Sequence, residues 1–326
     1  MHPTRRQILG ALLGSAAATA SAPLFAQAWP ARPIRLIVPF GPGSATDTLA
    51  RTISEPLSRA LKQPIVLEHK PGANTTIATN QVAKATPDGY TFGLLTNSGL
   101  AASPGGLTEG VTYDPVKELA YITTVASVDY VMVAHPSLNV STLRQVVDHV
   151  KANPGKLSYG SGNTGGISYM GWFVRANGLD IAHAQYKSVP PAMVDLVAGH
   201  VQLMVADAGS AAPQIQAGKV RAIAVTTPKR HPLLPDVPTF VESGFPQPPD
   251  FSGWWAMTAP AGTPNEILDR INTELVPILK QPEIVASLLR AGIVANPSTR
   301  EAATRYQRDQ LAEWTKMIKE TGLKAQ

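Results

Sequence analysis

Short apolar runs alternate with helix-like segments along most of the chain, and this alternation limits the possible folds more than any other feature. In the first third, strands are expected at residues 34–39, 64–69 and 90–96, with helices at 44–62 and 77–84 between them. A β-α-β-α-β order with short connections rich in glycine and proline predicts a parallel sheet with helices on both faces.

A second alternating series follows the first. Its expected strands are 128–136, 157–160, 181–186, 201–206 and 220–226, and its expected helices are 141–152, 166–177 and 190–198. Two such series in one chain predict two α/β units, each built around a mainly parallel sheet flanked by helices.

The proline-rich segment 232–250 then interrupts the pattern. Proline fixes φ and lacks a backbone donor, so we expect extended connecting chain there. A strand is expected next, at 253–262, and two further helices are indicated by capping patterns that start at Thr263 and Ser298. These last elements need a sheet to lie on, and the first sheet is the economical choice.

The expected domain organisation is therefore two lobes joined by two crossings, near residues 125 and 252. Residues 29–126 and 253–326 would form lobe 1, and residues 127–252 would form lobe 2. Two crossings between two lobes make a hinge that can open and close.

The N-terminus predicts export. Arg5 and Arg6 precede an apolar run from Ile8 to about Ala20, and small residues end at 26–28 in an A-x-A pattern. The run is too short to span a bilayer, so residues 1–28 are expected to be a signal peptide. Thr4 to Leu9 also fits a twin-arginine signal, and an ordinary secretory signal with two adjacent basic residues remains the alternative.

Composition excludes several classes of protein. The chain contains no cysteine, so neither a disulfide framework nor a lipid anchor on a cysteine is expected. Its 28 basic and 23 acidic residues are scattered, which argues against a nucleic-acid partner. The seven histidines show no metal-binding spacing, and no nucleophile motif is present. We expect a periplasmic monomer without metal or cofactor, and no enzyme.

Two glycine-rich loops are the strongest candidates for a binding site. Residues 39–47 read PFGPGSATD and residues 159–166 read YGSGNTGG, and each loop follows an expected strand and precedes an expected helix. Ligands of α/β sheets bind at the carboxyl ends of strands, where unpaired backbone N–H groups at helix N-termini favour anions. One such loop in each lobe predicts a cleft with two anion-binding walls. The alternative is that glycine and proline merely make tight turns, and Ser44-x-x-Asp47 is also an ordinary capping box.

The second loop also has the G-x-G-x-x-G spacing of a dinucleotide-binding protein, at Gly160, Gly162 and Gly165. Such proteins carry an acidic residue at the end of the next strand, which holds the ribose. Here Asp180 lies before that strand, and Lys187 lies at its far end. The acidic residue is at the wrong end, so nicotinamide dinucleotides are not expected as cofactors.

Several other polar residues follow expected strands and share the same rim. Thr96, Asn97 and Ser98 follow the third strand, although all three are also good turn formers. Asp207 either orients a polar group of the ligand or caps the next helix. Trp254 and Trp255 are neighbours on a strand, so one is expected in the core while the other faces the cleft.

Segments spread over the chain resemble the substrate-binding proteins of tripartite tricarboxylate transporters, the Bug receptors. The segments are PIRLIVPFGPGSATDTLAR, VAKATPDGYTFGLL, YKSVPPAMVDLVAGHVQLM, GKVRAIAVTTPKRHPLLPDVPTFVESGFP and APAGTPNEILDRINTEL. The resemblance implies a type II periplasmic-binding-protein fold that closes around a small carboxylate. It also implies that backbone amides, hydroxyls and waters hold the ligand, and that the integral-membrane subunits of a tripartite transporter are the partners.

Carried over by motif, the resemblance implies ligand contacts on both loops and at the acidic position. These contacts would fall on Phe40, Gly43, Ser44, Ala45, Asp47, Gly162, Asn163, Thr164, Gly165 and Asp207. Four positions depart from the family pattern, each by adding a side chain near the expected cleft: Ser44 replaces glycine, PGANTTIATN replaces a glycine-richer loop, Tyr169 replaces histidine and Ser188 replaces glycine. We therefore also expect Tyr169 near the ligand, and the identity of the ligand stays open.

Three functions are compatible with these observations. The first is a periplasmic receptor that captures a small organic acid between its lobes and delivers it to a tripartite transporter. The second is a sensory solute receptor that hands its closed form to a signalling partner. The third, an exported α/β enzyme, has the least support, because no catalytic motif accompanies the loops.

Overall fold

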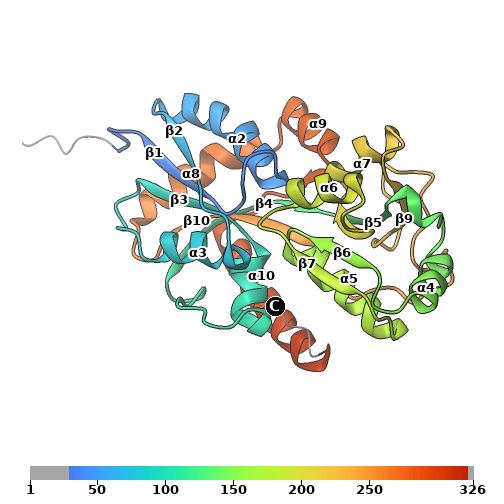
Figure 1. Ribbon diagram of the computed structural model, residues 1–326. Helices are drawn as coiled ribbons and strands as arrows, with labels where there is room; N and C mark the ends of the chain where they lie inside the picture. The colour runs from blue at the N-terminus through green and yellow to red at the C-terminus, as the bar shows by residue number, and fades with distance from the viewer. Residues whose placement is uncertain (1–28, 322–326) are drawn as a thin grey trace, which may run out of the picture.

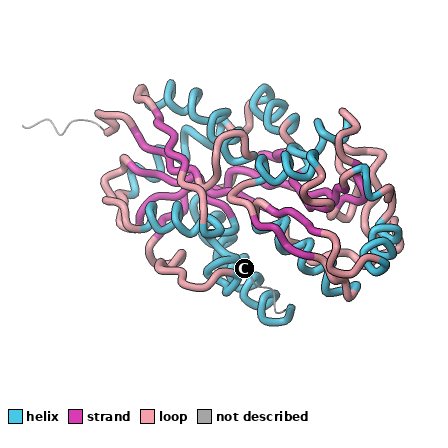
Figure 2. Tube along the Cα trace, in the orientation of Figure 1, coloured by secondary structure: helices cyan, strands magenta, loops and turns pink. Residues whose placement is uncertain are grey.

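The computed structural model describes residues 29–321, so the expected signal peptide lies outside the described residues. Within residues 29–321, eleven strands form two separate sheets, one of six strands and one of five. We call the six-stranded sheet with its helices the first lobe, and the five-stranded sheet with its helices the second lobe (Figure 1). Figure 2 shows both groups of strands with helices packed around them. The expected two-lobed α/β architecture is confirmed.

The first sheet combines the first series of strands with elements from the C-terminal part. Its order is β11 (Ile293–Ala295), β4 (Leu119–Val128), β10 (Gly253–Pro260), β3 (Thr91–Thr96), β1 (Ile34–Val38) and β2 (Ile65–His69). β1 runs parallel to β2 and β3, as the alternation predicts. β10 is antiparallel to both β3 and β4, because the chain returns from the second lobe in the opposite direction.

The second sheet has the order β7 (Ala182–Gln185), β6 (Ser158–Ser161), β8 (Leu203–Asp207), β5 (Tyr130–Ala134) and β9 (Arg221–Val225). β6 runs parallel to β7 and β8, whereas β5 is antiparallel to its neighbours β8 and β9. β5 therefore has the same place in the second sheet as β10 has in the first, because each is antiparallel to both of its neighbours. Each is the strand on which the chain arrives from the other lobe.

Helices cover both sheets. Those of the first lobe are α2 (Ala45–Leu61), α3 (Thr76–Ala83), α8 (Asn265–Ile278), α9 (Pro282–Arg290) and α10 (Arg300–Thr321), with the short helical segments η1 (Ala73–Thr75) and η2 (Ser98–Leu107). Those of the second lobe are α4 (Leu143–Ala152), α5 (Thr164–Asn177), α6 (Val189–Ala198) and α7 (Ala208–Gln216), with η3 (Pro136–Leu138). None of the helices within residues 29–321 is long and apolar enough to cross a membrane.

Helix α2 illustrates how the sequence builds these layers. Leu49, Ile53, Leu57 and Leu61 recur every four residues, and all four side chains are buried. That spacing places them on one face of the helix, which packs toward β1, β2 and the helices α8 and α9. The charged residues between them stay on the solvent side.

The two crossings between the sheets differ in length: the first is one residue long, and the second is a long segment. β4 ends at Val128 and β5 starts at Tyr130, so Asp129 alone separates the two sheets there. The return runs from β9 through the proline-rich segment to β10, and it is tied to the second lobe by a hydrogen bond from the Phe251 N–H to the Tyr169 hydroxyl at 3.1 Å.

The structure adds two strands that the sequence interpretation did not include, β4 and the short β11. β4 lies before the expected strand 128–136, and it occupies a central place in the first sheet between β10 and β11. Its sequence, LAYITTVASV, mixes small and hydroxyl residues with β-branched ones, which weakened the periodicity. The signal that was present is the β-branched run 122–125.

One of the three predicted caps is confirmed, and two are wrong. The Ser44 side chain accepts from the Asp47 N–H at 3.2 Å and caps α2. The Thr263 hydroxyl instead donates to the Pro260 carbonyl, and α8 begins after Pro264 without a side-chain cap. At α10 the capping oxygen belongs to Thr299. The Ser298 hydroxyl accepts from the Thr124 N–H on β4. A local turn therefore engages Thr263, and a tertiary contact engages Ser298.

Candidate functional site

A cavity lies where the two lobes meet, at the carboxyl ends of strands from both sheets. Its first-lobe wall comes from the loop after β1, the residues after β3, the end of β4 and the start of β10, and its second-lobe wall comes from the start of β5, the loop after β6, the start of α6 and the end of β8. The space between its walls, counted out to the solvent boundary, is about 410 Å³.

Three helix N-termini point at this cavity. The residues that cap α2, α5 and α7 are Ser44, Asn163 and Asp207, and all three line the cavity wall. Each helix N-terminus carries the equivalent of about half a positive charge. Their convergence gives the cavity a positive potential without a cationic side chain.

The first-lobe loop is held in place by a buried carboxylate. Asp47 accepts hydrogen bonds from the Gly43 N–H at 2.9 Å and from the Arg51 Nε at 3.0 Å, and its other oxygen lies 2.7 Å from His69 Nε2. Burial would raise the pKa of Asp47, but these three partners outweigh burial and hold the pKa below its ordinary value. With Asp47 so engaged, the amides of Ala45 and Thr46 remain at the cavity wall without a helical partner.

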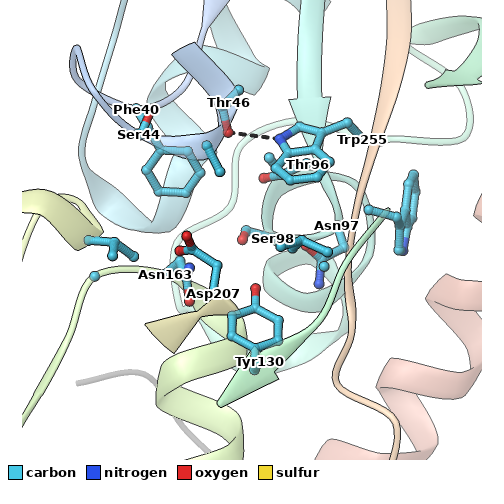
Figure 3. Close-up of a pocket in the computed structure, with 16 residues that line it drawn as sticks. Phe40, Ser44, Thr46, Thr96, Asn97, Ser98, Tyr130, Asn163, Asp207 and Trp255 are labelled. Atoms are coloured by element: carbon cyan, nitrogen blue, oxygen red, sulfur yellow. Dashed lines mark hydrogen bonds between the residues drawn. The ribbon is translucent and has the colours of Figure 1, made fainter. Parts of the chain in front are cut away.

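The second-lobe loop requires glycine at two places. A side chain on Gly162 would lie 2.2 Å from the backbone of Ser188, so this loop touches the start of α6 directly. A side chain on Gly165 would lie 2.2 Å from the ring of Tyr130. Glycine at 165 therefore leaves room for the Tyr130 ring, which forms the floor of the cavity in Figure 3.

Hydroxyl groups line much of the first-lobe wall. The Trp255 indole N–H donates to the Thr46 hydroxyl at 2.7 Å, which leaves the hydroxyl proton of Thr46 free to donate (Figure 3). The Thr164 hydroxyl donates across the lobes to the Ser98 hydroxyl, with the same consequence for Ser98. The buried Thr96 hydroxyl has no partner within the described residues. A ligand oxygen in the cavity would thus meet several available donors.

Asp207 is the only charged residue among the sixteen that line the cavity. Its side chain is 2% exposed, and it accepts from the Ser210 N–H at 3.1 Å as the cap of α7. Burial raises the pKa of Asp207, and the bonds from Ser210 offset only part of that effect. One carboxylate therefore faces three helix N-termini, and the positive potential is reduced but not cancelled.

Most of the residues predicted for the site lie on this cavity. Nine of them line it: Phe40, Ser44, Ala45, Thr96, Asn97, Ser98, Gly162, Asn163 and Asp207. The other five, Gly43, Asp47, Thr164, Gly165 and Tyr169, lie behind the wall and hold its loops and aromatic floor. The structure brings together both glycine-rich loops and the residues after β3, as their positions at strand ends predict.

Seven lining residues were not on the predicted set of contacts: Thr46, Val128, Tyr130, Val189, Gly253, Trp254 and Trp255. Five of them lie at the crossings, where β4 ends, β5 starts and β10 starts. The two tryptophans had been expected to point to opposite sides. The Trp255 indole lies against Thr46, whereas the Trp254 ring packs against Tyr306 and donates to Gln310, both on α10.

The four departures from the family pattern have different surroundings. Ser44 lines the cavity and caps α2. Ser188 lies in the backbone contact with Gly162, and Tyr169 is buried between Tyr130 and Phe251, with ring centroids 5.5 and 5.1 Å away. Asn74 lies in a neighbouring cavity. Among residues 29–321, no group of histidine and acidic side chains is arranged to hold a metal ion.

Comparison with known proteins agrees with this geometry. The family model described as tripartite tricarboxylate transporter family receptor matches residues 49–323. Protein BugT of Bordetella pertussis is 32% identical over 99% of both chains. The structure of R. palustris Rpa4515 with adipate is 31% identical, with a TM-score of 0.85, over 90% of this chain and 98% of that one. MatC of Rhodopseudomonas palustris with bound malate is 26% identical, with a TM-score of 0.82, over 89% of this chain and all of that one.

Proposed function

This chain belongs to the tripartite tricarboxylate transporter receptor family, and from that premise we propose that it captures a small organic acid between its lobes and delivers it to the membrane subunits of such a transporter. The observation that carries the proposal is the convergence of three helix N-termini on one interlobe cavity. Neighbouring structures with adipate and malate support a carboxylate as the ligand.

The donors around the cavity are sufficient for useful affinity. Micromolar binding needs about 8 kcal/mol, and a hydrogen bond to a charged group contributes roughly 1.5–3 kcal/mol. The proposed donors are the amides of Ala45 and Thr46 and the hydroxyls of Ser44, Thr96 and Ser98. Three to five such bonds, less the ordering cost of closure, reach the required free energy without a buried arginine.

The proposed cycle is opening and closing about the two crossings. We assign residues 29–126 and 253–326 to one lobe and 127–252 to the other, a division supported by which strands share a sheet. The protein would act as a periplasmic monomer, cleaved after Ala28, whose closed form the transporter recognises. No step in this cycle requires a cofactor or a catalytic residue.

Calorimetry on the chain beginning at Trp29, with a panel of aliphatic and aromatic acids, tests the proposal. We expect one chemical class to bind with micromolar affinity and small-angle scattering to report a more compact particle when it does. Failure of every acid to bind protein freed of ligand by unfolding and refolding would refute the proposal. Delivery is tested separately, by reconstituting uptake with the membrane subunits.

A matched pair of variants connects binding to the cavity. Asn163→Ala removes the cap of α5, where the Asn163 side chain accepts from the Gly166 N–H. Thr142→Ala removes the equivalent cap of α4, at which Thr142 accepts from the Gln145 N–H far from the cavity. Both should lose about 0.5–2 kcal/mol of stability. Only Asn163→Ala should also weaken ligand binding, and equal affinities would contradict the assignment of this cavity.

A further inference from the structure

A histidine of the first lobe supports the loop after β1, which forms part of the wall of the interlobe cavity. His69 is the last residue of β2, and its Nε2 lies 2.7 Å from Asp47 Oδ1. The other oxygen of Asp47 accepts from the Gly43 N–H and from the Arg51 Nε. Asp47 therefore links His69 to the loop, and His69 is the only hydrogen-bond partner of its Oδ1 within residues 29–321.

The conformation of Gly43 shows why this link matters for the cavity. Its φ is 79°, in the left-handed region, and the next three residues, 44–46, line the cavity wall. The Asp47 carboxylate holds the Gly43 N–H in that conformation. The Asp47 side chain is 5% exposed, so without His69 one of its oxygens would be buried and without a partner. A buried carboxylate in that state takes up a proton or turns away, and either change releases the loop.

The hydrogen bond also fixes which ring nitrogen of His69 carries a proton. The pKa of Asp47 lies below its ordinary value, so its carboxylate is ionised and can only accept, and His69 Nε2 must donate. The Nδ1 atom has no hydrogen-bond partner among the described residues, and the His69 side chain is 19% exposed. Water can therefore deliver a second proton to Nδ1 without breaking the bond to Asp47.

That second proton changes the charge behind the cavity wall. Asp47 and Arg51 carry opposite charges and pair at 3.0 Å, so the cluster that they form with a neutral His69 has no net charge. With a protonated imidazole, the same cluster has one net positive charge. Histidine ordinarily changes charge between pH 5 and 8. At the lower end of that range the cluster therefore adds to the positive potential at the N-terminus of α2.

The other charged groups near His69 are paired on the opposite face of β2. Glu68 and Lys70 flank His69 in the sequence, and side chains alternate between the two faces of a strand. Glu68 accepts from Arg35 of β1 at 2.6 Å and pairs with Lys70 at 3.8 Å. On the face that carries His69, helix α2 supplies the aspartate and the arginine of the cluster.

We propose that His69 is a positioning residue for the loop after β1, and that its protonation strengthens the binding of an anion in the cavity. It positions the loop through Asp47 in either charge state, and it adds a positive charge behind the loop when protonated. The inference rests on the proposed function, because it assumes that the interlobe cavity binds an anion. It adds a dependence on pH: a proton that favours the anion is taken up when the anion binds, so affinity rises as pH falls.

Calorimetry with succinate and benzoate, one aliphatic and one aromatic acid of the panel, tests the inference at pH 6.5 and pH 8.5. Both pH values lie well above the ordinary range in which carboxylic acids titrate, so the charge of the ligand stays nearly constant. Any acid of the panel that binds replaces these two where they do not. Titrations in two buffers of different ionisation enthalpy give the number of protons taken up on binding.

Three variants separate the hydrogen bond from the charge. His69→Gln keeps a donor in the place of Nε2 but cannot become charged, and His69→Leu removes the donor. His200→Gln is the matched control, because His200 also pairs with an acid, Asp195, at 3.3 Å, and neither residue lines the interlobe cavity. Urea unfolding of each variant shows whether it is folded under the conditions of the titration.

Wild-type protein should bind about twofold to threefold more tightly at pH 6.5 than at pH 8.5, the effect of one partly exposed charge. His69→Gln should match the wild type at pH 8.5 and gain nothing at pH 6.5. His69→Leu should bind about fivefold more weakly or worse at both pH values, and His200→Gln should behave as the wild type. Asp207 can also take up a proton beside a bound anion, so the uptake assigned to His69 is the part that His69→Gln loses.

Two results would overturn the inference and leave the proposed function intact. One is an equal pH dependence in wild type and His69→Gln, which would remove the role of the charge. The other is wild-type affinity in folded His69→Leu, which would remove the role of the hydrogen bond. Binding of no acid of the panel to the wild type would instead refute the proposed function.

Discussion

Gly209→Ala is expected to weaken ligand binding by keeping the two lobes apart. Gly209 lies in the first turn of α7 in the second lobe, against Ala291 and Gly292, which precede β11 in the first lobe. A Cβ on Gly209 would lie 1.6 Å from the Ala291 carbonyl oxygen. On the other side, a Cβ on Gly292 would lie 2.4 Å from the Gly209 nitrogen. The backbones of the two lobes are therefore in direct contact here.

The magnitude follows from this geometry. Ordinary contact begins at 3.4 Å, so the two backbones would have to separate by about 1.8 Å, the difference between that distance and 1.6 Å. Both clashing groups are backbone, and neither can rotate away as a side chain would. Overpacking of this kind costs roughly 1–3 kcal/mol. If this free-energy cost falls only on the closed form, it weakens ligand binding by roughly fivefold to a hundredfold.

Calorimetry with an acid that binds the wild type, and small-angle scattering with and without that acid, measure the effect. Gly218→Ala is the control, because Gly218 follows the other end of α7 with φ of 67° and a Cβ there meets nothing within 4 Å. It should lose about 1 kcal/mol of stability from backbone strain and keep wild-type affinity. Unchanged affinity and unchanged compaction in Gly209→Ala would show that this contact plays no part in closure.

Two further predictions concern stability. Burial raises the pKa of Asp207 above its ordinary value of 3.8, so its ionised form destabilises the ligand-free fold, increasingly as pH rises from that value through the folded-state pKa. Asp207→Asn should therefore be more stable than wild type at pH 7 and not at pH 3, by urea unfolding, and an equal difference at both pH values would contradict this. Tyr169→Phe should lower stability by about 1–3 kcal/mol, because it leaves the buried Phe251 N–H without its acceptor; an unchanged urea midpoint would show that another group replaces the hydroxyl.

The sequence predicts the architecture well wherever local periodicity and tertiary burial agree. β1, β3 and α2 follow directly from their apolar spacing, and the Ser44 cap is local to its helix. β4 was missed because most of its residues are buried whichever face they occupy, so its small, hydroxyl and β-branched residues show no regular alternation of apolar and polar positions. Thr263 and Ser298 have the composition of caps, but their hydroxyls bond to Pro260 and Thr124. A capping pattern does not show this competition, because for Ser298 the partner lies 174 residues away on β4, and for Thr263 it is a carbonyl of the preceding turn, outside the capping motif.

The residues of the candidate site likewise fall into those that the sequence predicts and those that it does not. The residues after β1, β3, β6 and β8 could be predicted, because strand ends of parallel sheets share one edge. Tyr130 and Gly253 could not, because their role depends on the two crossings. Tyr130 fills the space that Gly165 leaves, and a side chain on Gly253 would lie 2.8 Å from the Tyr130 hydroxyl. The sequence does show Gly165 and Gly253, but they are 88 residues apart, and no local pattern indicates that both contact Tyr130.

If the interlobe cavity binds an acid as proposed, the way in which it attracts the anion also determines how it can release it. A guanidinium buried against a carboxylate is costly to separate, by about 3–5 kcal/mol when one partner is left unpaired in the interior. Here the attraction comes from the N-termini of α2, α5 and α7, which belong to different lobes. When the lobes separate, the N-terminus of α2 moves away from those of α5 and α7, which share the second lobe, and the exposed amides return to water. The attraction therefore decreases as the cleft opens. Asp207 acts in the same direction, because its carboxylate offsets part of that potential in the closed form. Under the proposed cycle, the protein therefore retains an acid while closed and needs only the opening motion, without a chemical step, to release it.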